Sequence, residues 1–476
     1  MKENLLSVGI DLGTSTTQLI FSKLTLENTA SAYTIPRVTI TEKEILYRSR
    51  IVFTPLLGEN RIDFPKVREI LEQEYERAGI RKDQVDTGAV IITGETAGKE
   101  NAREVVNALS GFAGDFVVAA AGPDLESVIS GKGAGTDVYS RKHRLTAVNM
   151  DIGGGTSNLA VFSRGDTREV SCLDIGGRLV RIDRESRRIT YLAPKLQKLM
   201  EPEGWKLAVG MRADREKLRL LLRKMAEVLE QSVGLRSDCR GYETMITSQE
   251  LRETGDIACI SFSGGVADAI YHPEKFPDPF VFGDIGILLG EAIRESELFR
   301  RFRVIESQET IRATVVGAGS HTTKISGSTI TYTQNRFPIK NLPVLKLTRE
   351  EEKPGKLKAA IQKKMEWFRL EGEASLTALA LEGEENPSFG RVRQYAGEIL
   401  DGMRSMQNPG FPLVIVVEQD MGKVLGQTLS CLLDGEREVV CLDGIRLSEG
   451  EYIDIGKPAA GGQVLPVVVK TLVFHS

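Results

Sequence analysis

The stretch Val148–Phe162, VNMDIGGGTSNLAVF, places an aspartate, three glycines and two small hydroxyl residues between two apolar runs. Short apolar runs on either side of a glycine turn are typical of a buried strand that reverses into a second strand. Near the N-terminus, Ser7–Phe21, SVGIDLGTSTTQLIF, has almost the same order of residue types. The two stretches therefore predict a pair of related hairpins.

Each predicted turn has the composition of a phosphate-binding loop. Glycine lets the backbone approach a ligand, several N–H groups can then point into one concavity, and hydroxyl groups add donors. The predicted phosphate-binding residues are Gly13, Thr14, Ser15 and Thr16 in the first turn and Gly153, Gly154, Gly155 and Thr156 in the second. Asp11 and Asp151 precede the turns, and Mg²⁺ prefers such hard oxygen ligands, usually through water. The pair predicts a clamp for a triphosphate and its metal ion.

The triplet Asp–Ile/Leu–Gly is by itself weak evidence for such a site. It occurs five times, starting at Asp11, Asp151, Asp174, Asp284 and Asp454. An ordinary hairpin turn would explain any one of these triplets. Asp11 and Asp151 differ from the others because small hydroxyl residues follow them and lead into a further strand. We therefore expect the ligand at these two turns.

The order of predicted elements indicates an internal duplication and a third region. Residues 1–147 predict a hairpin followed by β-α-β-α, and residues 148–302 begin again with a hairpin, a third strand, a long helix and another strand. Residues 303–476 alternate further strands and helices. The expected fold class is α/β, with two duplicated halves around a nucleotide cleft and a C-terminal α/β region.

The composition excludes several classes of protein. The chain has 476 residues, 41% of them hydrophobic, which is enough for roughly three domains. A net charge of −4 gives no basic field for nucleic acid or an anionic membrane. The N-terminal apolar run is cut by Asp11, and no apolar segment approaches the ~20 residues that span a bilayer. The five cysteines lack a C-x-x-C spacing, which argues against a zinc site or disulfide framework. These features predict a cytoplasmic protein with no nucleic-acid or membrane partner.

The hairpins, with FSGGVADAI (262–270) and GDIGILLGEAI (283–293), resemble the phosphate-binding, adenosine and second connecting motifs of the superfamily of actin, heat-shock chaperone ATPases and sugar kinases. The resemblance implies two ribonuclease-H-like, actin-like ATPase domains around an ATP cleft. It implies that Asp11 and Asp151 organise Mg²⁺ and the attacking water and that the two turns cradle phosphates. It also implies that the backbone of Gly264 and Gly265 lies against the nucleoside.

Two parts of this resemblance leave alternatives open. VVGAGSHTTKISG (315–327) is an alternative adenosine strand. The first connecting segment would be AAAGPDLESVISGKGAG, where related chaperones carry a glutamate before the proline and this chain has Gly122. Asp124 or Glu126 is the expected substitute, and we assign the catalytic carboxylate of this segment to Asp124.

The whole chain resembles the family of ethanolamine ammonia-lyase reactivating factors. The stretches that carry the match run from end to end: IDLGTSTTQLIFS, ITGETAGKENA, GPDLESVISGKGAG, NMDIGGGTSN, FSGGVAD, VVGAGSHTT, EQDMGKVLGQTL, GEYIDIGKP and VLPVVVKTLVF. This family works with the adenosylcobalamin-dependent lyase that splits ethanolamine into acetaldehyde and ammonia. The resemblance implies an ATPase that is not itself the lyase and that uses ATP and Mg²⁺ to exchange damaged cobalamin for intact adenosylcobalamin.

The resemblance also names a partner, ethanolamine ammonia-lyase, and raises an association with the ethanolamine microcompartment. The chain lacks the Asp-x-His-x-x-Gly box that supplies a histidine to cobalt, and its four histidines have no metal-ligand spacing. Adenosylcobalamin is therefore expected on the partner lyase. The C-terminal region is the expected lyase contact, although an ordinary structural role explains it equally well.

Two other functions remain open from the sequence. A small-molecule kinase of the same superfamily would need a carboxylate base for the acceptor hydroxyl, and Glu95 in TGETAGKENA is the best candidate. Such a kinase would phosphorylate a small acceptor instead of releasing inorganic phosphate. An actin-like scaffold protein would use ATP to control assembly, and light scattering on addition of ATP would reveal it.

Overall fold

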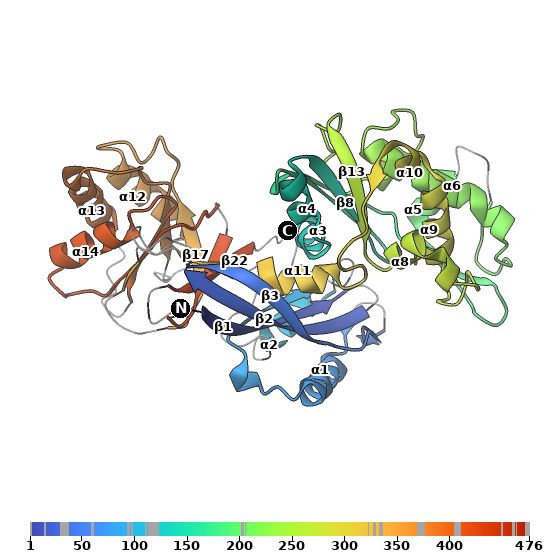
Figure 1. The fold of residues 1–476 in the computed structure, drawn as a ribbon, viewed down its shortest axis with the longest axis horizontal. Coiled ribbons are helices and arrows are strands. Elements are labelled where there is room, and N and C mark those ends of the chain that lie inside the picture. The colour runs from blue at the N-terminus through green and yellow to red at the C-terminus, as the bar shows by residue number, and fades with distance from the viewer. Residues whose placement is uncertain are drawn as a thin grey trace.

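The structure is a computed structural model. It describes residues 2–13, 16–28, 38–58, 61–92, 96, 99–109, 112, 123–200, 204, 206–321, 323–326, 330–332, 337–368, 377–403, 411–448, 451–458, 462 and 464–471. Three larger sheets organise these residues, and Figure 1 shows each sheet with its own helices. No helix in these ranges is long and apolar enough to cross a membrane.

The first sheet is built on the N-terminal hairpin. Its order is β3-β2-β1-β7, with β1 antiparallel to β2 and parallel to β7. The elements of this unit are β1 (Lys2–Leu12), β2 (Thr16–Asn28), β3 (Val38–Arg48), β4 (Val52–Phe53), β5 (Leu56–Leu57), β6 (Arg61–Ile62), α1 (Phe64–Ala78), β7 (Thr87–Ile92) and α2 (Ala102–Leu109). Alternate residues of β1, such as Val8, Ile10 and Leu12, pack with α1 and α2 in one core.

The second sheet repeats this arrangement. Its order is β10-β9-β8-β13-β14, with β8 antiparallel to β9 and parallel to β13. The elements are α3 (Pro123–Gly133), α4 (Thr136–His143), β8 (Thr146–Ile152), β9 (Ser157–Ser163), β10 (Asp166–Leu173), β11 (Val180–Ile182), β12 (Ile189–Leu192), α5 (Pro194–Met200), α6 (Arg215–Ser232), α7 (Tyr242–Met245), β13 (Ile257–Ser263), α8 (Ala267–Tyr271), α9 (Gly286–Glu295), α10 (Glu297–Arg301) and β14 (Arg303–Val304). The same strand order and directions in both sheets confirm the predicted duplication.

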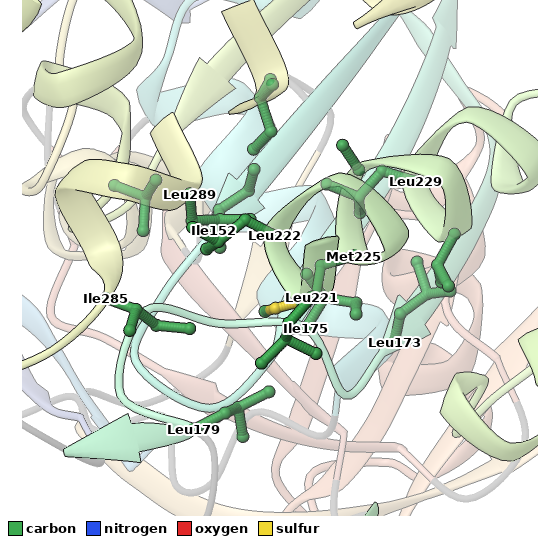
Figure 2. Close-up of a cluster of buried hydrophobic side chains, with 14 of the residues drawn as sticks. Ile152, Leu173, Ile175, Leu179, Leu221, Leu222, Met225, Leu229, Ile285 and Leu289 are labelled. Atoms are coloured by element: carbon green, nitrogen blue, oxygen red, sulfur yellow. The ribbon is translucent and has the colours of Figure 1, made fainter. Parts of the chain in front are cut away.

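A buried apolar cluster supports the second hairpin from one side. Figure 2 shows Ile152, Ile175 and Ile285 in the same cluster as residues of α6 and α9. Ile152 ends β8, and the other two isoleucines lie in loops that reach the same end of the sheet. Because each isoleucine is fully buried, these loops are anchored through their apolar side chains while the adjacent glycines stay free to form turns.

Two crossed helices connect the halves. The helix α3 packs on β8, β9 and β10, whereas α11 (Ala313–His321) packs on β1, β2 and β7, and Figure 1 shows α11 between α3 and the first sheet. A Cβ on Gly133 would lie 1.8 Å from the carbonyl oxygen of Ala313, and one on Gly317 would lie 2.0 Å from that of Ile129. Only glycine permits this approach of the two backbones.

The crossing corrects two predictions about glycine-rich segments. Residues 313–321 form α11, so the alternative adenosine strand at 315–327 is wrong. The sequence VVGAG resembles a strand and turn because it is apolar and glycine-rich, but its glycine serves the helix crossing. The predicted second connecting motif at 283–293 is also wrong. A connecting motif would link the two halves, whereas α9 packs on α6 and α8 within its own half.

The third sheet has eight strands in the order β15-β22-β21-β17-β18-β19-β20-β16. Its elements are β15 (Thr323–Ile325), β16 (Thr331–Tyr332), β17 (Ile339–Lys346), α12 (Leu357–Phe368), β18 (Ala378–Leu381), α13 (Phe389–Met403), β19 (Leu413–Val417), α14 (Gly422–Leu432), β20 (Val439–Leu442), β21 (Glu451–Ile455) and β22 (Pro466–Thr471). The central strands β17 to β20 are parallel and consecutive, and α12, α13 and α14 share one core on a single face. Val464 packs on Leu5 and Leu24, which joins this unit to the first sheet.

Residues 303–321 lie with the two halves, although the sequence assigns them to the C-terminal region. The strand β14 pairs with β13, and α11 covers the first sheet. These contacts favour a boundary after residue 321. The division of the chain into three regions otherwise stays a prediction.

Candidate functional site

The two glycine turns have the same hydrogen-bond geometry. The Gly13 N–H donates to the carbonyl oxygen of Thr16, and the Gly153 N–H donates to that of Thr156, both at 2.9 Å. Each turn is four residues long, because the strand pairing resumes between Leu12 and Thr17 in one hairpin and between Ile152 and Ser157 in the other. The resemblance of the two sequence stretches therefore reflects two copies of one local structure.

Donors from the surrounding structure hold the carbonyl groups of both turns. The Gly13 carbonyl accepts the hydroxyls of Thr54 at 2.8 Å and Thr96 at 3.1 Å. In the second turn, the carbonyls of residues 153 and 154 accept N–H groups of residues 177 and 178 at 3.0 and 2.7 Å. A carbonyl dipole aimed at a bound anion would repel it, so engaging these oxygens elsewhere suits the turns for phosphate.

The aspartates before the turns are both buried. Asp11 is 7% exposed and Asp151 is 5% exposed. The Asp151 carboxylate accepts the Ser263 hydroxyl at 2.5 Å and a hydrogen bond from the Thr314 hydroxyl. Burial raises the pKa of Asp151 to about 6, although these two hydrogen bonds oppose the shift. Ser263 ends β13 and Thr314 lies in α11, so Asp151 joins the second sheet to the connecting helix.

Two amide side chains that the sequence analysis missed lie beside the aspartates. Gln18 is paired with Asp11 across the first hairpin, and Asn158 is paired with Asp151 across the second. Side chains of directly opposed residues lie on one face of the sheet. Gln18 Oε1 and Asn158 Oδ1 are buried without a hydrogen-bond partner in the described ranges. Their signal in the sequence is an amide seven residues after each aspartate.

The segment 310–314 brings the two hairpins together. The Thr310 carbonyl accepts the N–H of Gly264 at 3.0 Å, and the Ile311 carbonyl accepts Gln18 Nε2 at 3.2 Å. Three residues further along, Thr314 reaches Asp151. Polar residues of the first hairpin and of the second therefore contact the same short segment. This segment closes the site at the start of α11.

The turn after β13 is compatible with a nucleoside contact. Gly264 has a φ of +85°, and a Cβ there would lie 2.4 Å from the carbonyl oxygen of Ile152. Nothing lies within 4 Å of a Cβ placed on Gly265, which is exposed. The backbone of Gly265 is therefore available to a ligand at the carboxyl ends of β8 and β13, where open α/β sheets bind their ligands.

A groove of about 580 Å³ is lined by residues that contact the two turns. Phe53 lines it from the first half and pairs with Thr16 of the first turn. Arg178 lines it from the second half, and the backbone N–H of Arg178 donates a hydrogen bond to the carbonyl oxygen of the turn residue Gly154. The guanidinium of Arg178 also lies over the Phe53 ring at 5.1 Å. The groove is thus shared by the two halves.

The comparisons with known proteins identify the family. A family model described as "Ethanolamine utilisation protein EutA" matches residues 3–475. The chain belongs to this family. Proteins named "Ethanolamine ammonia-lyase reactivase EutA" from Escherichia coli (strain K12) and Salmonella typhimurium (strain LT2) are each 38% identical to it over 480 residues, covering 99% of both chains. Among solved structures, the Ppx/GppA family member of Aquifex aeolicus matches with 14% identity and a TM-score of 0.41, covering 66% of this chain and 97% of that one.

Not every residue assigned to the site from the sequence is placed by the structure of this EutA-family member. Thr14, Ser15, Glu95 and Gly122 lie outside the described residues. Asp124 is exposed in the first turn of α3, whereas Glu126 is 8% exposed. Near them, the Ser127 hydroxyl donates to the Ser171 carbonyl at 3.4 Å, so the start of α3 lies beside β10. The catalytic role of Asp124 stays a prediction.

Proposed function

We propose that this protein is an ATP-dependent reactivating factor for ethanolamine ammonia-lyase. The observation that carries the proposal is the pair of equivalent turns, each preceded by a buried aspartate, in a chain 38% identical over its full length to proteins named as reactivases of that lyase. ATP would bind between the hairpins, with its phosphates on Gly13 to Thr16 and Gly153 to Thr156 and its nucleoside along Gly264 and Gly265.

The oxygen-rich lining suits Mg²⁺. Asp11 and Asp151 would hold the ion, and the unpartnered amide oxygens beside them match its preference for oxygen ligands and retained water. When bound, Mg²⁺ neutralises phosphate charge. Ser263 and Thr314 orient the Asp151 carboxylate through their hydroxyls, and the hairpin aspartates would also orient the attacking water.

Opening and closing of the two halves would transmit the nucleotide state of this protein to the lyase. Both aspartates are more than nine-tenths buried, so a separation of the halves would open them to a nucleotide and its metal ion. The crossed helices α3 and α11 link the halves, and a change in their angle would move the third unit, which packs on the first sheet. ATP would therefore act mainly as a ligand that shifts the lyase toward a state that releases damaged cobalamin.

The remaining parts of the proposal concern partners and location. Adenosylcobalamin would be handled by the lyase, and the third unit would contact the lyase. The protein would act in the cytoplasm, in association with the ethanolamine microcompartment.

The test is recovery of lyase blocked by cyanocobalamin. The full-length protein is mixed with blocked ethanolamine ammonia-lyase, ATP, Mg²⁺ and free adenosylcobalamin, and a parallel mixture omits ATP. We expect recovery only with ATP, and none with Asp151→Asn. Asp166→Asn, an exposed position at the start of β10, is the matched control and should behave as the wild type. Recovery without ATP, or full recovery with Asp151→Asn, would refute the proposal.

A further inference from the structure

The amide oxygens of Gln18 and Asn158 are not satisfied by the protein around them. Gln18 is 3% exposed and Asn158 is 2% exposed. Neither Gln18 Oε1 nor Asn158 Oδ1 receives a hydrogen bond from the part of the chain that the structure describes. A buried acceptor without a donor destabilises the folded protein, because it has lost its hydrogen bonds to water without replacement. Such a group calls for a bound ion, water or ligand as its missing partner.

The position of these amides repeats in both halves. Each is the residue directly opposite a buried aspartate across the hairpin, Gln18 opposite Asp11 and Asn158 opposite Asp151. Opposed side chains on one face have Cβ atoms about 5 Å apart. The two hairpins thus present the same pair of groups, a carboxylate and an amide oxygen, at the site where segment 310–314 joins them.

The orientation of the Gln18 amide indicates whether its ligand is a cation or an anion. Its nitrogen is occupied, because Nε2 donates to the Ile311 carbonyl at 3.2 Å, so the oxygen is the end left for a ligand. An acceptor oxygen beside a carboxylate repels phosphate oxygens and attracts a cation. In the described ranges no group of three or more His, Cys, Asp and Glu side chains could hold a metal ion. Carboxylates alone therefore do not complete a cation site.

We propose that Gln18 and Asn158 are ligands of the divalent cation, directly or through water, and complete with Asp11 and Asp151 a set of two carboxylate and two amide oxygens. This inference rests on the proposed function and assigns two residues that motif reasoning passes over. Mg²⁺ and Mn²⁺ both accept carboxylate, amide and water oxygens, so Mn²⁺ is a suitable probe.

The experiment measures Mn²⁺ affinity by electron paramagnetic resonance on the full-length protein in the presence of ADP. Asn158→Asp and Gln18→Glu exchange an amide oxygen for a charged oxygen of the same reach, and we expect each to tighten Mn²⁺ binding by about threefold or more. Asn158→Leu and Gln18→Leu should weaken it by about fivefold or more. Gln394→Glu adds the same charge at an exposed position of α13 and should leave the Mn²⁺ affinity unchanged.

Failure of this inference is distinguishable from failure of the proposed function. Binding of ADP is measured separately in EDTA, and a wild-type protein that binds no adenine nucleotide would refute the nucleotide site itself. If ADP binds and all four variants keep wild-type Mn²⁺ affinity, the assignment is overturned. If Asn158→Asp and Gln18→Glu weaken both Mn²⁺ and ADP binding, the amides face phosphate, which also overturns it. Should the leucine variants fail to fold, the two carboxylate variants still decide.

Discussion

Replacement of Asp151 by asparagine should stabilise the metal-free protein and at the same time lower its ATP turnover more than tenfold. Asp151 is 5% exposed, and burial raises its pKa to about 6 from a reference value of 3.8. The folded state therefore binds the proton of this carboxyl more tightly than the unfolded state does. Asparagine has the same shape, carries no charge and still accepts hydrogen bonds from Ser263 and Thr314.

The sign and size of the effect follow from this difference in pKa. Because the folded pKa is the higher one, the stability contributed by the protonated form is fully present below about pH 3.8 and is lost as the pH rises through about 6. The difference of 6 − 3.8 in pKa corresponds to about 3 kcal/mol at pH 7. Asp151→Asn should recover up to about 3 kcal/mol at pH 7 and much less near pH 4.

Urea unfolding in EDTA, followed at pH 7 and pH 4.5, measures this prediction. The variant should show a higher midpoint than the wild type at pH 7, and the two midpoints should converge at low pH. ATP turnover should fall more than tenfold. Saturating Mg²⁺ and ATP should then stabilise the wild type more than the variant, because only the wild type keeps the charged ligand. A variant of unchanged or lower stability at pH 7 would show that burial of a charged Asp151 is not destabilising and would refute the reasoning.

Two further predictions concern the connecting helices. Gly317→Ala should destabilise the protein by about 1–3 kcal/mol in chemical denaturation, because the new Cβ would lie 2.0 Å from the Ile129 carbonyl oxygen. The control is Gly397→Ala in α13, where no atom lies within 4 Å of the new Cβ. This control should be neutral or stabilising by up to about 1 kcal/mol. Equal losses from the two substitutions would argue against a tight crossing. Thr314→Val should lower kcat for ATP by about tenfold with little change in ATP affinity, because a positioning hydroxyl acts on the oriented carboxylate. Thr314→Ser should restore turnover, and a valine variant with normal kcat would remove Thr314 from the site.

The five Asp–Ile/Leu–Gly triplets show that one short motif can mark either a buried anchor of a loop or a ligand-binding turn. The apolar residue of each triplet, Leu12, Ile152, Ile175, Ile285 and Ile455, is fully buried. The triplet therefore marks a strand end or loop anchored in a core, whether or not a ligand is near. The hydroxyl residues after Asp11 and Asp151 identify the two triplets that form equivalent hairpin turns, and this distinction was available from the sequence.

Gln18 and Asn158 were within reach of sequence reasoning but needed the register of the hairpins. In each hairpin, one residue separates the aspartate from the four-residue turn. The residue seven positions after the aspartate therefore lies opposite it across the hairpin. Their lack of donors was not predictable, because hydrogen-bond partners come from distant segments such as residues 310–314. The same limit applies to Asp124, whose expected role came from a motif position alone.

Local patterns determined the duplicated hairpins, the α/β class and the turns, because alternation of apolar residues and the conformational freedom of glycine act over a few neighbouring residues. The functions of the other glycine-rich segments depended on the tertiary structure. Residues 313–321 have the composition of a strand and turn, yet they form a helix whose Gly317 meets the backbone of α3. Whether a glycine makes room for a phosphate or for another helix is decided by which distant backbone packs against it, and that contact leaves no local pattern in the chain.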